Sequence, residues 1–463
     1  MTHFTSKRAL SLSATLLSIV LSTCLFFSCT LDPVNPNAVT EDKALTTRDG
    51  IFNTAVGLQR FFAVDLMSAI IRTPGTTSRE LAITRTFINL TDLEAGGQGL
   101  SNENTDILVL FQNLCRAIEI SNQLIAATPS VTAIPDSTRN GILAIAHLHK
   151  AMALSYFIQY FEQAPINTDR RERAVYAPRA QVLAEALRSL DQAEQLFARG
   201  NTAQLRANVL SSGLDMVNTI RAFRARCHLM AGNYQAAIDA ANSVDLTARS
   251  QFVYDAVSPQ NIMWLNILTV GAGANTAATS YACRDSLGLP PQFFEVADST
   301  RRNFFLGSVL RTPAVGAAAP QFHHRNHLGF GALNNSPIPI YRPIEMILIR
   351  AEANVRLGRL ADAVADINRV RQKTGLNIAF NIGANPNPYT GPQTERALLD
   401  EIYKQRCIEL YLSGLRMEDA RRLGIPGPQP GQPIPSTTRT RNFYPYPRRE
   451  RDNNPNTPPD PVI

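Results

Sequence analysis

The chain has 463 residues and a formal net charge of +7, with 45 Lys and Arg against 38 Asp and Glu. Apolar residues make up 44% and charged residues 18%, which excludes a disordered chain and a protein with many membrane spans. The basic residues are scattered along the sequence, so we expect no nucleic-acid partner. The length suffices for two average domains or for one large helical domain.

The N-terminus has the pattern of a secretory signal. Lys7 and Arg8 precede an apolar stretch over residues 9–27, which is diluted by hydroxyl side chains and followed by a turn-rich sequence. Such a stretch is barely long enough to span a bilayer. A cleaved signal peptide over residues 1–28 is therefore favoured over a transmembrane anchor.

A lipid attachment site is predicted directly after this signal. Ser28 provides the small residue that cleavage requires, and the thiol of Cys29 would carry the lipid. Thr23 before Cys24 is a poorer match because Thr is bulkier. Residues 29–45 would then form a tether between the membrane and the folded part of the chain.

Two later segments share a pattern of helix, glycine turn and helix. Gly232 separates amphipathic runs over residues 220–231 and 233–241, and Gly358 separates a second such pair. Glycine readily adopts the left-handed conformation that ends a helix, and Pro343 suits the first position of the helix before Gly358. Small residues at matching positions in both segments are typical of tetratricopeptide (TPR) repeats.

Apolar spacing predicts further helices over residues 106–127, 142–161, 180–197 and 394–412. The region from about 247 to 340 has no clear period, so we expect long loops there. The last 38 residues hold 11 of the 29 prolines, so no regular structure is expected in this tail. The sequence therefore predicts a mainly α fold. In it, TPR-like helix-turn-helix repeats form a right-handed helical scaffold, with long irregular loops and a Pro-rich C-terminal tail.

Four cysteines follow the leader, namely Cys115, Cys227, Cys283 and Cys407. They lie far apart, and three of them fall in helix-like stretches. We therefore expect free, mostly buried thiols rather than a disulfide framework.

The C-terminal third carries motifs whose order and spacing resemble those of one known family. These motifs lie at residues 342–353, Gly358, 363–371, Gly375, Leu376, 402–410, 414–424 and 444–456. Segments upstream fall in the same order, at residues 29–33, 122–125, 156–165 and 221–241. Together they resemble the SusD/RagB family of outer-membrane nutrient-binding lipoproteins of Bacteroidota. The sequence departs from the family at Gln405, where an acid is common, and at Ala420 and Leu423.

The resemblance implies a lipid-anchored, surface-exposed outer-membrane protein that captures a nutrient. It would deliver that nutrient to a SusC-like TonB-dependent transporter, acting as the lid of the transporter's barrel. A glycan or oligosaccharide is the expected nutrient, with a peptide as the alternative, and neither catalysis nor a cofactor is expected. The mature chain would comprise an N-terminal SusD-like helical part over residues 46–246 and a C-terminal RagB/SusD part over 247–463, which carries the ligand loops.

Residues suited to sugar binding gather in the irregular region. Aromatic rings stack on the apolar face of a pyranose, while polar side chains reach its hydroxyl groups. The candidate ligand residues are Trp264, Tyr254, Tyr281, Arg284, Asp285 and Asn266. Residues 72–89 could complete the pocket. Trp264, the only Trp, also has apolar neighbours, so a core position remains an equal alternative.

Charged residues near the C-terminus allow two interpretations. Arg406 and Glu409 are three residues apart, as are Arg416 and Asp419, so each pair can share a helix face. Two such carboxylates could form the acid pair of a glycosidase. A structural Arg–carboxylate network is favoured instead, because buried charges need partners. The resemblance also implies a structural role.

Three histidines, His323, His324 and His327, lie close together. With a carboxylate from elsewhere, His327 and one neighbour could ligate a metal ion. Flanking Gly, Ala and Pro residues indicate an exposed loop instead, so no metal site is predicted.

Two other functions remain alternatives to nutrient binding. One is a TPR-type protein-interaction scaffold without a small ligand. The other, less favoured, is a glycan-active hydrolase.

Overall fold

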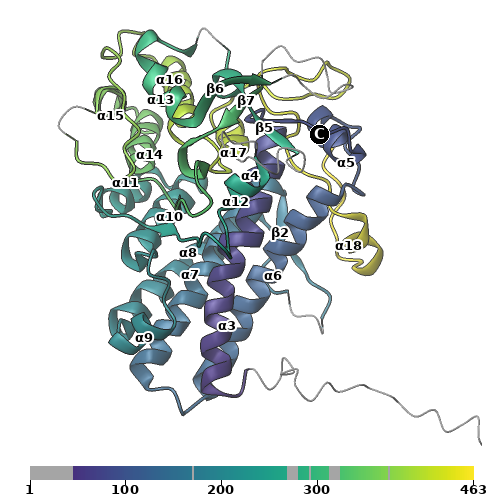
Figure 1. Cartoon of the computed structure of the whole chain (residues 1–463), viewed down its shortest axis with the longest axis vertical. Coiled ribbons are helices and arrows are strands. Elements are labelled where there is room, and N and C mark those ends of the chain that lie inside the picture. The colour runs from purple at the N-terminus through teal and green to yellow at the C-terminus, as the bar shows by residue number, and fades with distance from the viewer. Residues whose placement is uncertain (1–44, 169–171, 268–279, 291–292, 312–323, 374–375) are drawn as a thin grey trace, which may run out of the picture. The chain divides into compact units, whose positions relative to one another are not determined.

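Helices dominate the computed structural model, which describes residues 45–168, 172–267, 280–290, 293–311, 324–373 and 376–463 (Figure 1). The predicted signal, Cys29 and most of the tether lie outside the described residues. The principal helices are α3 (Arg48–Phe61), α4 (Met67–Thr77), α5 (Ile88–Ala95), α6 (Thr105–Ala127), α7 (Asp136–Tyr160), α8 (Arg179–Gly200), α9 (Ala203–Asn208), α10 (Met216–Met230), α11 (Tyr234–Asn242), α12 (Ile262–Asn266), α13 (Ser299–Phe305), α14 (Pro343–Arg356), α15 (Leu360–Gln372), α16 (Glu395–Glu409), α17 (Arg416–Arg422) and α18 (Arg448–Asn453). A π-helical turn, η1 (Phe62–Leu66), joins α3 to α4.

The glycine turns occur where the sequence predicts them. Gly232 lies between α10 and α11 with φ of 77°, and Gly358 lies between α14 and α15 with φ of 73°. Positive φ is strained for residues with a Cβ atom, which explains the choice of glycine. Pro343 is the first residue of α14, where its missing N–H costs no hydrogen bond. The predicted mainly α fold with helix-turn-helix repeats is confirmed.

Successive helices pack side by side along the chain. Helix α7 contacts α6 and α8, α8 contacts α10, and α11 contacts α14 in the second repeat (Figure 1). Two described stretches, Arg48–Thr77 and Asp136–Tyr160, are long and apolar enough to cross a membrane. Their apolar windows are 61% and 94% buried inside the fold, as expected for core helices.

The region predicted as long loops contains more regular structure than expected. Its strands are β4 (Gln251–Phe252), β5 (Tyr281–Arg284), β6 (Leu306–Arg311), β7 (His324–His327) and β8 (Ile338–Pro339). Together with β1 (Leu81–Ile83), three of them form an antiparallel sheet in the order β1-β5-β7-β6, and β4 pairs with β8. A further pair joins β2 (Gln163–Pro165) to β3 (Tyr176–Pro178). Such short strands, drawn from distant segments, leave no alternating pattern in the sequence.

The proline-rich tail packs against the helices. It is irregular as predicted, except for the six-residue helix α18. Tyr444 and Tyr446 are fully buried, and both rings contact Phe161. The Tyr444 hydroxyl lies 2.6 Å from the Thr77 hydroxyl, and the Tyr444 N–H donates to the Tyr160 carbonyl oxygen. The tail therefore packs the C-terminal end of the chain against α4 and the end of α7.

All four described cysteines are free, as predicted. Cys227, Cys283 and Cys407 are buried, and Cys115 is half-buried. Burial raises the pKa of the Cys227 and Cys283 thiols to about 12, so both stay protonated at neutral pH. Protonated, buried thiols of this kind are unreactive and contribute to the packing of the core.

Candidate functional site

Trp264 lies on the short helix α12, which one side chain holds in place. The Asn261 side-chain oxygen Oδ1 accepts hydrogen bonds from the N–H groups of Met263 and Trp264, at 2.8 and 3.0 Å. The Asn261 amide donates to the carbonyl oxygens of Phe330 and Ser336. Trp264 itself is half-buried. A core residue would be fully buried and an open stacking platform fully exposed, so its burial decides for neither.

Two other predicted ligand residues lie near the end of α12. Ile267 forms a bridge with Tyr281, which brings α12 beside β5. The Asn266 amide donates to the Ser68 hydroxyl on α4 at 3.3 Å. One turn later on α4, the Arg72 guanidinium lies 5.8 Å from the centre of the Tyr281 ring. We call Trp264, Asn266, Tyr281, Ser68 and Arg72 the α4–α12 group.

The other predicted ligand residues have partners elsewhere. The Tyr254 hydroxyl donates to the Ala63 carbonyl oxygen at η1. Arg284 is buried and donates to the Glu94 carboxylate at 2.8 Å. The half-buried Asp285 accepts from Arg325 at 2.5 Å. The structure thus places Trp264, Asn266 and Tyr281 on the adjoining elements α12 and β5, while Tyr254, Arg284 and Asp285 each bind a partner of their own.

The histidine segment forms strand β7 rather than a loop. His323 lies outside the described residues. His327 is buried, and its Nδ1 lies 3.6 Å from the Cys283 sulfur. Burial lowers the pKa of His327 to about 3. Among the described residues, no group of three or more His, Cys, Asp or Glu side chains lies close enough to hold a metal ion.

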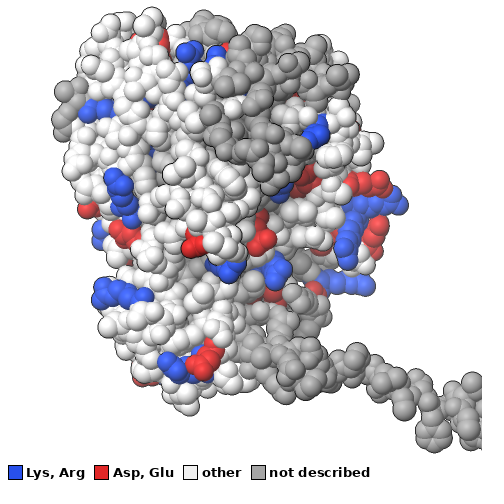
Figure 2. All heavy atoms as spheres, in the orientation of Figure 1, with Lys and Arg blue, Asp and Glu red and all other residues white. Residues whose placement is uncertain are grey.

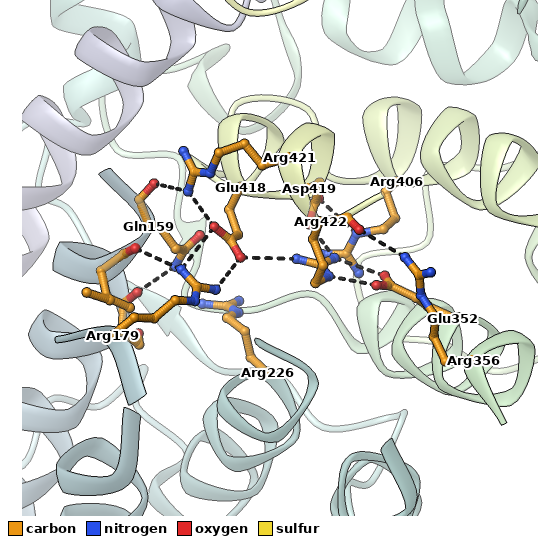
Figure 3. Close-up of polar contacts among 12 residues, drawn as sticks. Gln159, Arg179, Arg226, Glu352, Arg356, Arg406, Glu418, Asp419, Arg421 and Arg422 are labelled. Atoms are coloured by element: carbon orange, nitrogen blue, oxygen red, sulfur yellow. Dashed lines mark hydrogen bonds and ion pairs between the residues drawn. The ribbon is translucent and has the colours of Figure 1, made fainter. Parts of the chain in front are cut away.

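The predicted charge network is present with different pairings (Figure 3). Arg406 binds Asp419 at 2.8 Å rather than Glu409, and Asp419 also binds Arg422. Arg422 continues to Glu352 on α14 at 2.7 Å. Glu418, missed by sequence reasoning, joins α8 to α17 by accepting from Arg179 and Arg421. On the face of the molecule that Figure 2 shows, by contrast, Lys and Arg are scattered among Asp and Glu.

Glu409 is the centre of a second buried cluster. It pairs with Arg301 at 3.0 Å, with Arg342 at 3.4 Å and with Lys373 at 2.5 Å. Burial alone would raise the pKa of Glu409, but Lys373 and the two arginines together lower it to about 2. Arg416, predicted to share a helix face with Asp419, instead lies 3.8 Å from the Glu80 carboxylate.

These carboxylates are poorly placed for glycoside hydrolysis. Burial opposes ionisation of Asp419 as well, yet Arg406 and Arg422 lower its pKa. Glu409 and Asp419 are therefore both ionised at neutral pH, whereas a glycosidase needs one protonated acid. Both are also buried, at 0% and 3% exposure, where a glycan cannot reach them.

A pocket of about 410 Å³ is lined by none of the residues of the α4–α12 group. It is bounded by α3, η1, α7, the loop after α9 and strand β4. None of the six predicted ligand residues lines it. Sequence reasoning missed this pocket because its lining comes from separate helices and loops, each with an ordinary local pattern.

Comparisons with a family model and with solved structures both point to proteins described as SusD or SusD-like. A family model described as SusD family matches residues 331–460. No curated protein sequence matches the chain. A solved SusD-like protein from Bacteroides fragilis shares 15% identity with a TM-score of 0.67, over 92% of this chain and 99% of that one. A SusD superfamily protein from Bacteroides vulgatus shares 16% identity with a TM-score of 0.64, over 89% and 98%.

A third similar structure has a more specific description. It is a SusD-like carbohydrate binding protein from Bacteroides vulgatus, with 14% identity and a TM-score of 0.61, over 81% of this chain and 83% of that one. At these identities the structures establish a shared fold. The SusD family model thus matches the C-terminal part of the chain, residues 331–460, and the solved structures share its fold along the chain.

Proposed function

We propose that this protein is a lipid-anchored protein of the outer membrane that binds a glycan or oligosaccharide. It passes that ligand to a SusC-like TonB-dependent transporter, over whose barrel it acts as a lid. The observation that carries the proposal is the SusD family match to residues 331–460, together with the SusD fold. The carbohydrate binding described for one similar structure supports a sugar rather than a peptide.

The α4–α12 group is the proposed glycan site. The half-buried Trp264 ring offers an apolar surface, and Asn266, Ser68 and Arg72, on the adjoining helices α12 and α4, offer hydrogen-bonding groups. This combination suits a pyranose, which has an apolar face and a polar edge. The same polar groups argue against a plain TPR-type interaction scaffold, which would need only a helical groove.

Trp264→Ala should weaken glycan binding by about 1–3 kcal/mol, in line with the loss of one stacked ring. Calorimetric titration of oligosaccharides into the mature protein measures this change. Trp264→Phe keeps an aromatic ring and should recover part of the affinity. Tyr234→Ala, on repeat helix α11, is the matched control and should bind like the wild type. If Trp264→Ala binds normally or unfolds, Trp264 belongs to the core and the glycan site lies elsewhere.

Cys29→Ala should release the protein from the membrane fraction, because the acyl chains supply its attachment. Each buried CH₂ contributes about 0.8 kcal/mol, so two or more chains anchor a protein firmly. Cys24→Ala is the matched control and should remain attached. Mass spectrometry of the mature N-terminus and fractionation measure this, and a SusC-like barrel should co-purify with the lipidated protein. An unmodified N-terminus at another residue would contradict the proposed anchor.

A further inference from the structure

The 410 Å³ pocket has mainly apolar walls. Aliphatic and aromatic side chains line most of it, among them Val56, Ala63, Leu210, Leu214, Phe252 and Ile340. No Asp or Glu is among its lining residues, and its exposed Arg60 is the single Arg or Lys there. The volume falls in the range of small-molecule sites, about 300–1,000 Å³.

Hydrogen bonds and ring contacts hold these walls in place. The Gln59 amide on α3 donates to the Ala55 and Val209 carbonyl oxygens, and its own carbonyl oxygen accepts from the Ser211 N–H at 2.9 Å. Gln59 thereby ties the loop after α9 to α3. The Phe252 ring stacks on Phe62, with centroids 6.2 Å apart. These contacts hold α3, the loop after α9 and strand β4 in place around the pocket.

One buried imidazole lines this mainly apolar pocket. His149 on α7 is 2% exposed, and its Nδ1 lies 2.8 Å from the Ile145 carbonyl oxygen. Because a carbonyl oxygen only accepts, Nδ1 must carry the proton. Burial lowers the pKa of His149 to about 4, so the ring is neutral at pH 7 and Nε2 keeps a lone pair. Among the described residues, none donates a hydrogen bond to this Nε2.

We propose that this pocket binds a small phenol-like molecule whose hydroxyl group donates to Nε2 of His149 and whose ring packs against Phe252 and the aliphatic walls. No described residue donates to this nitrogen, so a ligand hydroxyl would supply the donor that it lacks. The mainly apolar lining suits an aromatic ring with one hydroxyl group better than a sugar with many. The pocket is thus a second ligand site, independent of the proposed glycan site.

The test uses 1-naphthol and its methyl ether, 1-methoxynaphthalene, titrated into the mature protein. Both probes have the same rings, but only naphthol can donate a hydrogen bond. The wild type should bind naphthol about tenfold more tightly, as one buried hydrogen bond predicts. His149→Phe keeps a ring against Phe62 and should abolish this preference. Val56→Trp should block both probes, since Val56 is 42% exposed and lines the pocket.

Val217→Trp is the matched control, because Val217 is an exposed helical valine (37%) outside this pocket's lining. It should bind both probes like the wild type. The proposal is overturned if neither probe binds, if both bind equally to the wild type, or if the preference survives in His149→Phe. Binding that persists in Val56→Trp also overturns it, because the probe then lies elsewhere. No readout uses a glycan, so failure here leaves the proposed function untouched.

Discussion

Glu409→Gln should lower the free energy of unfolding by about 3–5 kcal/mol, the range measured when one partner of a buried ion pair is removed. The substitution keeps the side-chain shape but leaves Arg301, Arg342 and Lys373 without their shared carboxylate. All three cations are buried, so water cannot replace it. Urea unfolding followed by circular dichroism measures the loss.

Glu395→Gln is the control on the same helix. Glu395 binds Arg356 at 3.1 Å, but its side chain is 60% exposed, so its loss should cost less than about 1 kcal/mol. Equal stability of the two variants would show that Glu409 does not hold the cluster together.

The pH dependence gives this prediction a second readout. Burial lowers the pKa of Lys373 to about 8 although Glu409 opposes the shift, so removing Glu409 should lower it further. A lysine whose pKa is depressed by folding binds fewer protons folded than unfolded, so stability rises with pH. The destabilisation in Glu409→Gln should therefore shrink as the pH rises towards about 8 and stay constant above it, where Lys373 is neutral in both folded proteins.

Mild acid should also unfold the protein, through histidines that the fold keeps neutral. Burial lowers the pKa of His147 and His149 to about 4 and that of His327 to about 3. The unfolded chain, with histidine pKa values near 6.5, binds more protons below about pH 6.5. Stability is thus fully present above that pH and is lost as the pH falls towards 4.

His149→Phe isolates one of these contributions. Between about pH 6.5 and pH 5, His149 alone should cost about 1.5 kcal/mol, and the variant should lose that much less stability over this interval. Carboxylates with lowered pKa values, such as Glu409, stay ionised in this range. His228→Phe is the control, because His228 is only half-buried and should change the slope less. An unchanged slope in His149→Phe would mean that this histidine is protonated in the folded state.

The repeats could be predicted from sequence because their signals are local. Gly232, Gly358 and Pro343 each report on the backbone within a few residues, and the structure places each where expected. The family resemblance could also be predicted, because its main motifs lie within residues 342–456. This stretch falls inside the region that the family model matches.

The pairings could not be predicted in the same way, because they depend on how distant segments meet. Spacing on one helix suggested Arg406 with Glu409, but α17 brings Asp419 closer to Arg406, and Lys373 reaches Glu409 from the end of α15. The sheet could not be predicted for the same reason, since β1 lies about 200 residues before its partner β5. The 410 Å³ pocket could not be predicted either, because its lining comes from α3, α7 and β4, which are far apart in the sequence.

The buried tyrosines of the tail also set the order in which the protein can assemble. Tyr444 forms a hydrogen bond with Thr77, 367 positions earlier in the chain. Tyr446 forms one with Gln163, 283 positions earlier. The aromatic cluster around Phe161 therefore stays open to water until nearly the whole chain has been synthesised. If the signal predicted over residues 1–28 directs export, this delay favours an unfolded state during synthesis, the state that can thread through an export channel. Folding would then be completed on the far side of the membrane.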